Sequence, residues 1–204
     1  MTSLLDAARS GDPLLVGVAA LVLAAVVGYL VGSVNPASII ARVRRTDLRA
    51  VGSGNPGATN AARAFGWQVG VLVGFLDMLK GLLPALAFQL LDLHTAALVA
   101  GFAAVVGHVT SPYLRGRGGK GVATSFGAVL AVQPWWAIPV IAVFLVTLLV
   151  TRRVGLSSVA GSLALVPSAL LFPHAWTDVV FAAAITVLVV SRHYRNVRAA
   201  VVRD

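Results

Sequence analysis

The chain has 204 residues, of which 58% are hydrophobic and 11% are charged, and its formal net charge at pH 7 is +9. Soluble domains carry about 25% charged residues, so this composition excludes a soluble protein and indicates one integral membrane domain over residues 1–204. The chain has no cysteine and no glutamate, and its four histidines are scattered. Disulfides, cysteine nucleophiles and a metal site are therefore excluded, and we predict no cofactor.

The first apolar segment follows a short polar stretch, residues 1–12. It covers Pro13–Ala41 and has no charged residue. This segment is longer than the apolar core of about 7–15 residues in a cleavable signal peptide. We therefore interpret it as a retained transmembrane span.

Basic residues mark the loops. Fourteen of the sixteen Lys and Arg residues fall into four blocks: Arg42, Arg44, Arg45, Arg49 and Arg63; Arg115, Arg117 and Lys120; Arg152 and Arg153; and Arg192, Arg195, Arg198 and Arg203. Aspartates lie before or between these blocks, at Asp6, Asp12, Asp92 and Asp178. Because Lys and Arg collect in cytoplasmic loops, the pattern predicts cytoplasmic segments at 42–63, 113–121, 152–153 and 192–204. It favours this topology over a nucleic-acid-binding surface.

If the four basic blocks lie on one side of the membrane, an even number of crossings separates each pair. Apolar segments that satisfy this rule are Ala64–Leu91, Leu93–Leu114, Val154–Phe172 and Ala175–Ser191. The segment Gly121–Thr151 contains "QPWW" at Gln133–Trp136, where proline ends a helix and tryptophan favours the membrane interface. We therefore divide it into two short helices. The prediction is an all-α membrane protein with seven transmembrane helices, its N-terminus outside and its C-terminus inside.

The first predicted loop contains "GSGNPGATNAAR" at residues 52–63. Its glycines permit turns in which backbone N–H groups converge on an anion, and neutral donors and arginines accompany them. The candidate phosphate-binding residues are Arg49, Gly52, Gly54, Asn55, Gly57, Thr59 and Asn60, with Ser53 and Arg63 beside them. Thr59 or Asn60 is also a candidate cap for the following helix, whose positive end would then face the same anion. The alternative is a polar cytoplasmic turn with topology-setting arginines.

The second predicted loop contains "RGRGGKGVAT" at residues 115–124. It lacks the Walker A pattern GxxxxGK[ST], because Gly121 follows Lys120 and Leu114 stands where the first glycine belongs. Backbone amides, Arg117 and Lys120 at the start of a helix still indicate an anion site. The two loops together predict two phosphates held close to each other.

Five further polar residues stand at helix ends or within the spans. In "SRHYRN", His193 and Asn196 are three residues apart and face the same way on a continuing helix. A histidine there can be a general base, a phosphate donor or an interfacial residue. Asp77 and Lys80 are also three apart, and we expect a structural ion pair near the cytoplasmic ends of the helices. We interpret His108 as a buried hydrogen-bond partner.

Three motifs, "GSGNPGATNAAR", "GHVTSPYLRGRGGKGVAT" and "RHYRN", resemble those of the bacterial membrane glycerol-3-phosphate acyltransferases that use acyl phosphate, the PlsY family. The likeness extends from "GSVNPAS" at Gly32–Ser38 to the C-terminal tail. The resemblance implies a seven-helix enzyme of the cell inner (cytoplasmic) membrane with its active site at the cytoplasmic face. We expect a monomer.

The resemblance also implies a reaction in phospholipid biosynthesis. A fatty acyl group would pass from acyl phosphate to the sn-1 hydroxyl of glycerol 3-phosphate, which gives lysophosphatidate and phosphate. Carried over by motif, Ser53, Arg63, His193 and Asn196 are implied to be catalytic. Gly118, Gly119 and Lys120 match the phosphate-binding segment.

Two rival functions differ in testable features. A transporter of organic phosphates would need polar residues along a path through the membrane, and the external half of the chain has almost none. Acyl transfer from acyl-CoA is typical of acyltransferases with an HxxxxD motif, and no histidine here has an aspartate five residues later.

Overall fold

The computed structural model describes residues 13–172, 175–194 and 198, and within these residues the chain is helical with no β-strand. The elements are α2 (Pro13–Ser33), α3 (Pro36–Val43), α4 (Ala58–Phe65), α5 (Trp67–Gln89), α6 (His94–Thr110), η1 (Pro112–Leu114), α7 (Val122–Val132), η2 (Pro134–Trp136), α8 (Ala137–Thr151), α9 (Val154–Leu163), α10 (Leu165–Leu171) and α11 (Trp176–Arg192). The predicted all-α class is confirmed for this part of the chain.

Five helical stretches of the described chain are long and apolar enough to cross a membrane: Pro13–Val43, Trp67–Gln89, His94–Leu114, Pro134–Thr151 and Val154–Leu171. Helices α7 and α11 are shorter, with 11 and 17 residues. At a rise of 1.5 Å per residue, α7 is about 16 Å long, roughly half the apolar thickness of a bilayer. The seven crossings and the orientation of the termini therefore stay predictions.

The predicted span Pro13–Ala41 lies within one apolar helical stretch that is long enough to cross a membrane, but the helix is not continuous, because it breaks at Val34 and Asn35. Asn35 has an extended backbone, and its side-chain oxygen accepts a hydrogen bond from the Ser38 N–H at 2.8 Å. Pro36 has no N–H to continue α2, whereas it fits the first position of a new helix. An asparagine cap followed by proline therefore ends α2 and begins α3.

Two other predicted spans are divided in the same way. Residues 64–91 contain the end of α4 and then α5, separated by Gly66 at φ +96°. Residues 154–172 form α9 and α10, which meet at Ala164. The predicted division at Gln133–Trp136 is confirmed, since η2 separates α7 from α8.

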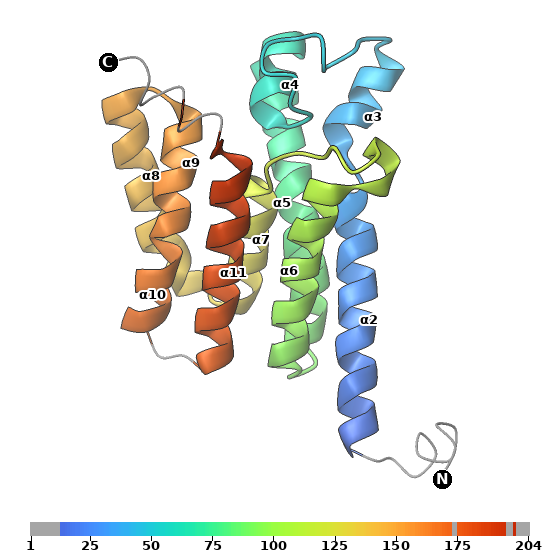
Figure 1. Cartoon of the computed structure of the whole chain (residues 1–204), viewed down its shortest axis with the longest axis vertical. Helices are drawn as coiled ribbons and strands as arrows, with labels where there is room; N and C mark the ends of the chain where they lie inside the picture. The colour runs from blue at the N-terminus through green and yellow to red at the C-terminus, as the bar shows by residue number, and fades with distance from the viewer. Residues whose placement is uncertain (1–12, 173–174, 195–197, 199–204) are drawn as a thin grey trace.

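Figure 1 shows how the helices are arranged. Helices α8, α9 and α10 lie on one side, α2 and α3 on the other, and α5, α6, α7 and α11 between them. Loops 44–57, 111–121 and 152–153 and the C-terminal end of α11 all lie at the top of this view, which we call the loop end. The four basic segments, as far as they are described, therefore gather at one end of the bundle.

Close helix contacts hold this arrangement. Helix α2 packs along α6, and α5 packs along α7. A Cβ added to Gly32 would collide with the Ala104 carbonyl, and one added to Gly81 would collide with the Thr124 carbonyl. Small residues let helix backbones approach in this way within a membrane. The α5–α7 contact fixes the start of α7, which follows the second loop.

Candidate active site

A cavity of about 1400 Å³ opens among the helices at the loop end. Twelve of the residues predicted from the sequence line it: Arg49, Ser53, Gly54, Asn55, Gly57, Thr59, Asn60, Arg63, Arg117, Gly118, Lys120 and His193. Gly52 and Gly119 lie in the same loops without lining the cavity, and Asn196 lies outside the described residues. Segments far apart in the sequence therefore meet at one cavity, as the anion-site prediction requires.

The first loop turns through two glycines. Gly52 and Gly54 have φ angles of +52° and +66°, which other residues rarely adopt. The Ser53 N–H donates to the Asn60 side-chain oxygen at 3.1 Å, and the Asn60 amide donates to the Leu48 carbonyl at 2.9 Å. The loop is therefore closed around the Asn60 side chain.

Asn60 lines the cavity as predicted, but its side chain bonds to the loop backbone. It is 1% exposed, and both ends of its amide are used by the loop backbone. The cap of α4 is Gly57, with no side-chain cap bond, so capping by Thr59 or Asn60 is wrong. The first N–H groups of a helix have no partner within it, so those of Ala58 and Thr59, which line the cavity, can serve an anion.

The second loop also differs from the prediction in its backbone. The N–H groups of Gly118 and Gly119 donate to the carbonyls of Val109 and His108, at 3.0 and 3.1 Å. They are therefore occupied and cannot bind a phosphate in this conformation. The donors on this side are Lys120 and the first turn of α7, which begins after Gly121 at φ +82°.

Two arginines tie the second loop to its neighbours. The Arg49 guanidinium donates to the Arg117 carbonyl at 2.9 Å, which joins the first loop to the second. The Arg192 guanidinium lies 3.5 Å from the Gly118 carbonyl and joins the second loop to α11. Both cations thus lie at the cavity with their positions set by backbone oxygens.

Positive charges face one another across the cavity. The pKa of the Lys120 ammonium is lowered by burial and by the nearby charges of Arg63 and Arg192. All three side chains line the cavity. Repulsion among cations in a confined space favours a bound anion, because a negative charge between them removes the repulsion.

His193 lies at the end of α11 and is 2% exposed. Its Nδ1 is 2.8 Å from the Val189 carbonyl, so Nδ1 carries the proton and the neutral ring leaves Nε2 as an acceptor. Burial lowers the pKa of His193, and the charges of Lys120 and Arg192 lower it further, against the opposing effect of the Val189 hydrogen bond. A neutral histidine at this cavity has the form that a general base needs.

The sequence interpretation missed several residues at the site. Arg192, Arg152, Arg153 and Ser158 line the cavity. The three arginines were assigned only to topology, because arginines beside a span are ordinary and nothing local shows which of them face a cavity. No sequence pattern marks Ser158 as a site residue, since serine is common in packed membrane helices.

The expected ion pair within the membrane is confirmed. Lys80 Nζ lies 2.9 Å from Asp77 Oδ1, and both side chains are buried, but they lie near the middle of α5 and not at its end. The buried position expected for His108 is also confirmed, with its Nδ1 at 3.4 Å from the same carboxylate oxygen. Among the described residues, no group of three His, Cys, Asp or Glu side chains has an arrangement suited to a metal ion.

The deeper part of the cavity is apolar. It is lined there by Val140, Phe144, Leu165, Ile185 and Val189 from α8, α10 and α11. A cavity with a cationic mouth and an apolar interior suits a ligand that has an anionic head and a hydrocarbon chain.

Comparison with known proteins agrees with these features. A family model described as glycerol-3-phosphate acyltransferase matches residues 22–202. A glycerol-3-phosphate acyltransferase of Aquifex aeolicus is 42% identical over 175 residues, which cover 83% of this chain and 89% of the relative. One of Thermoanaerobacter pseudethanolicus is 36% identical over 178 residues, covering 87% and 90%.

Two solved structures are also similar. Both are crystal structures of PlsY (YgiH), an integral membrane glycerol 3-phosphate acyltransferase, in its glycerol 3-phosphate form and its lysophosphatidic acid form. Their TM-scores are 0.86 and 0.84, at 35% and 34% sequence identity. Each match covers 89% of this chain and 92% of the other.

Proposed function

This chain belongs to the glycerol-3-phosphate acyltransferase family, and we propose that it takes the acyl group from acyl phosphate and transfers it to the sn-1 hydroxyl of glycerol 3-phosphate. The products are lysophosphatidate and inorganic phosphate. The enzyme is an integral membrane protein, and we propose that its cavity opens to the cytoplasm at the inner membrane.

One observation carries the choice of donor: the cavity joins several cationic groups to an apolar interior. Arg63, Lys120 and Arg192 approach one another closely enough to lower the pKa of Lys120. Two phosphoryl groups, one from each substrate, would relieve this repulsion. The apolar walls further in would hold the fatty chain, which places the acyl carbonyl between the chain and the phosphates.

The chemistry needs little beyond positioning. The glycerol hydroxyl oxygen attacks the acyl carbonyl carbon, the bond from that carbon to the phosphate oxygen breaks, and the hydroxyl proton is lost. Phosphate is already a good leaving group, and holding two reactants in attack geometry contributes about 7–11 kcal/mol to lowering the barrier. Cations at the cavity mouth stabilise the negative charge that develops.

Two groups can accept the hydroxyl proton. His193 is neutral with Nε2 available, and a substrate phosphate dianion is the other candidate. Ser53 lies on the exposed first loop, and its N–H is held by Asn60. We propose that Ser53 binds a phosphate or carbonyl oxygen and that no acyl-enzyme forms.

The donor is tested with purified protein, glycerol 3-phosphate and either palmitoyl phosphate or palmitoyl-CoA. We expect lysophosphatidate and an equal amount of free phosphate with palmitoyl phosphate, and none with palmitoyl-CoA. Lysophosphatidate formed from palmitoyl-CoA at an equal or higher rate would refute the proposed donor.

The role of Ser53 is tested by stopping the reaction in acid during turnover of a slowly reacting acyl phosphate and measuring the protein mass. We expect unmodified protein. Ser53→Ala should retain measurable activity, because the hydroxyl binds substrate without forming a bond to carbon. A mass increase equal to one acyl group, absent in Ser53→Ala, would overturn this assignment.

A further inference from the structure

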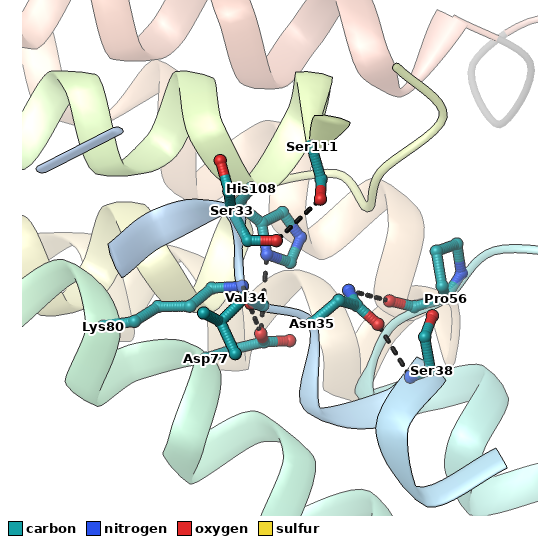
Figure 2. A network of polar contacts seen from close by, with 9 residues as sticks. All are labelled: Ser33, Val34, Asn35, Ser38, Pro56, Asp77, Lys80, His108 and Ser111. Atoms are coloured by element: carbon teal, nitrogen blue, oxygen red, sulfur yellow. Dashed lines mark hydrogen bonds and ion pairs between the residues drawn. The ribbon is translucent and has the colours of Figure 1, made fainter. Parts of the chain in front are cut away.

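The break between α2 and α3 leaves the backbone carbonyls of Ser33 and Val34 without helical partners, and two side chains take them, one from α5 and one from the residue that follows α6. The Ser111 hydroxyl donates to the Ser33 carbonyl at 2.6 Å, and Lys80 Nζ donates to the Val34 carbonyl at 2.6 Å. Figure 2 shows both contacts at the break. A lysine from α5 therefore holds the point at which the first span ends.

Lys80 is also connected to two other buried titratable side chains, Asp77 and His108. It pairs with Asp77 at 2.9 Å, and the same carboxylate oxygen lies 3.4 Å from Nδ1 of His108 on α6. The three residues are 6%, 3% and 4% exposed. Ionisable groups inside a membrane protein are costly, so a connected group of three calls for a role.

His108 lies directly beneath the second loop. A Cβ added to Gly119 would collide with Nε2 of the His108 ring and lie 2.8 Å from its Cε1. The Gly119 N–H donates to the His108 carbonyl. The loop that carries Lys120 therefore lies on the His108 ring, and Asp77 contacts the opposite nitrogen of that ring.

At the break between α2 and α3, these contacts extend to the first loop. The Asn35 amide, next to Val34 in the break, donates to the Pro56 carbonyl at 2.9 Å. A continuous path of contacts thus runs from Pro56 through the break, Lys80, Asp77 and His108 to Gly119. It connects the two loops from below, inside the helix bundle.

We propose that Asp77, Lys80 and His108 form a positioning brace, which sets the distance between the two phosphate-binding loops and thereby the attack geometry. Asp77 and His108 also line the cavity, but in this proposal all three residues act through the loops, and the inference rests on the proposed function of the loops as holders of the two substrates. Each loop holds its own phosphate by its own donors, so loss of the brace affects turnover more than the binding of either substrate. A misplacement of about 1 Å can reduce a rate by about 100-fold.

The principal test replaces both charges of the brace. Asp77→Asn or Lys80→Met alone would leave a buried charge without its partner, whereas the double variant removes both. In the double variant we expect kcat per folded protein to fall about tenfold or more, while the KM of each substrate changes by less than about threefold.

The chain offers a matched control at the other end of the helices. His94 Nε2 lies 2.8 Å from Oδ1 of the buried Asp178, which joins the starts of α6 and α11. The α6 helix separates this pair from the loop end by about 25 Å at 1.5 Å per residue. The double variant His94→Gln with Asp178→Asn should lower thermal stability and leave kcat within about twofold of the parent, because the loops keep their positions.

Two outcomes would overturn the brace. One is a kcat of folded Asp77→Asn/Lys80→Met within about twofold of the parent. The other is a rise in both KM values at unchanged kcat, which would indicate a role in binding alone. If the parent uses acyl-CoA and not acyl phosphate, the proposed donor fails, and the same comparison is made with acyl-CoA.

A second measurement does not depend on the folding of that variant. Gly119→Ala should lower kcat about tenfold or more in the parent, since its methyl group meets the His108 ring, but less than about threefold in a His108→Ala background. His108→Ala alone should lower kcat with little change in KM. Equal costs of Gly119→Ala in both backgrounds would show that the ring does not position the loop.

Discussion

Three cations, Arg63, Lys120 and Arg192, face one cavity, and Lys120 has a lowered pKa because burial and the other two charges disfavour its ammonium form. A bound phosphate reverses this effect, since the anion favours the charged lysine. The pKa of His193 is also lowered, by burial and by the positive charges of Lys120 and Arg192, which favours its neutral form. The charges at this cavity therefore favour a bound anion and an unprotonated histidine.

His193→Gln tests the role of this histidine. Because the pKa of His193 lies below its usual value near 6.5, the free enzyme keeps the neutral ring at lower pH, and the acidic limb of kcat/KM should lie below pH 6.5. In the variant we expect kcat to fall about 100-fold and this limb to disappear. The measurement is kcat/KM between about pH 5 and 8. A normal rate and pH profile would show that His193 is only structural.

At the scale of helices, the break between α2 and α3 anchors the first loop. Asn35 caps α3 through its side-chain oxygen and holds the Pro56 carbonyl through its amide. It is 5% exposed, so water cannot replace these bonds easily. One asparagine thus determines where a helix begins and where a loop of the candidate site lies.

Asn35→Ala removes both bonds, whereas Asn35→Ser keeps a helix cap but is too short to reach Pro56. We expect the free energy of unfolding to fall by about 1–3 kcal/mol for alanine and by less for serine. Both variants should lose activity, because both release the first loop. Denaturant unfolding in detergent and kcat/KM measure the two effects. Unchanged stability in Asn35→Ala, or full activity in Asn35→Ser, would contradict this account.

For the whole molecule, the gathering of the basic segments at one end suggests its orientation in the membrane. Loops 44–57, 111–121 and 152–153 lie at the loop end, and the turn between α5 and α6 lies at the other (Figure 1). Because basic loops stay in the cytoplasm, we expect the cavity to face that side.

The natural absence of cysteine allows a direct test of this orientation. Arg115 and Asp92 are both exposed, at opposite ends of α6. A membrane-impermeant maleimide applied to intact spheroplasts should label Asp92→Cys, and it should label Arg115→Cys only after permeabilisation. Labelling of Arg115→Cys in intact spheroplasts would reverse the predicted orientation.

Much of the helical framework follows from local sequence features. Long apolar segments between the basic blocks predicted the spans, and "QPWW" predicted the division between α7 and α8. The spacing of Asp77 and Lys80 predicted their ion pair. The break at Asn35 was missed, although an asparagine followed by proline is a local signal. Hydropathy dominated that interpretation because the segment carries no charge.

The sequence by itself therefore determined the class of protein and the loops that lie at the cavity, and twelve of its fifteen candidate site residues line that cavity, because composition and turn chemistry are local properties. Only the tertiary structure decided how those residues are used. The N–H groups of Gly118 and Gly119 are taken by carbonyls of α6, and the Asn60 amide is taken by the loop itself. Arg192 joins the site because α11 ends beside the second loop. Each backbone donor and each charge finds its partner through packing between segments far apart in the chain, and no local pattern encodes that choice.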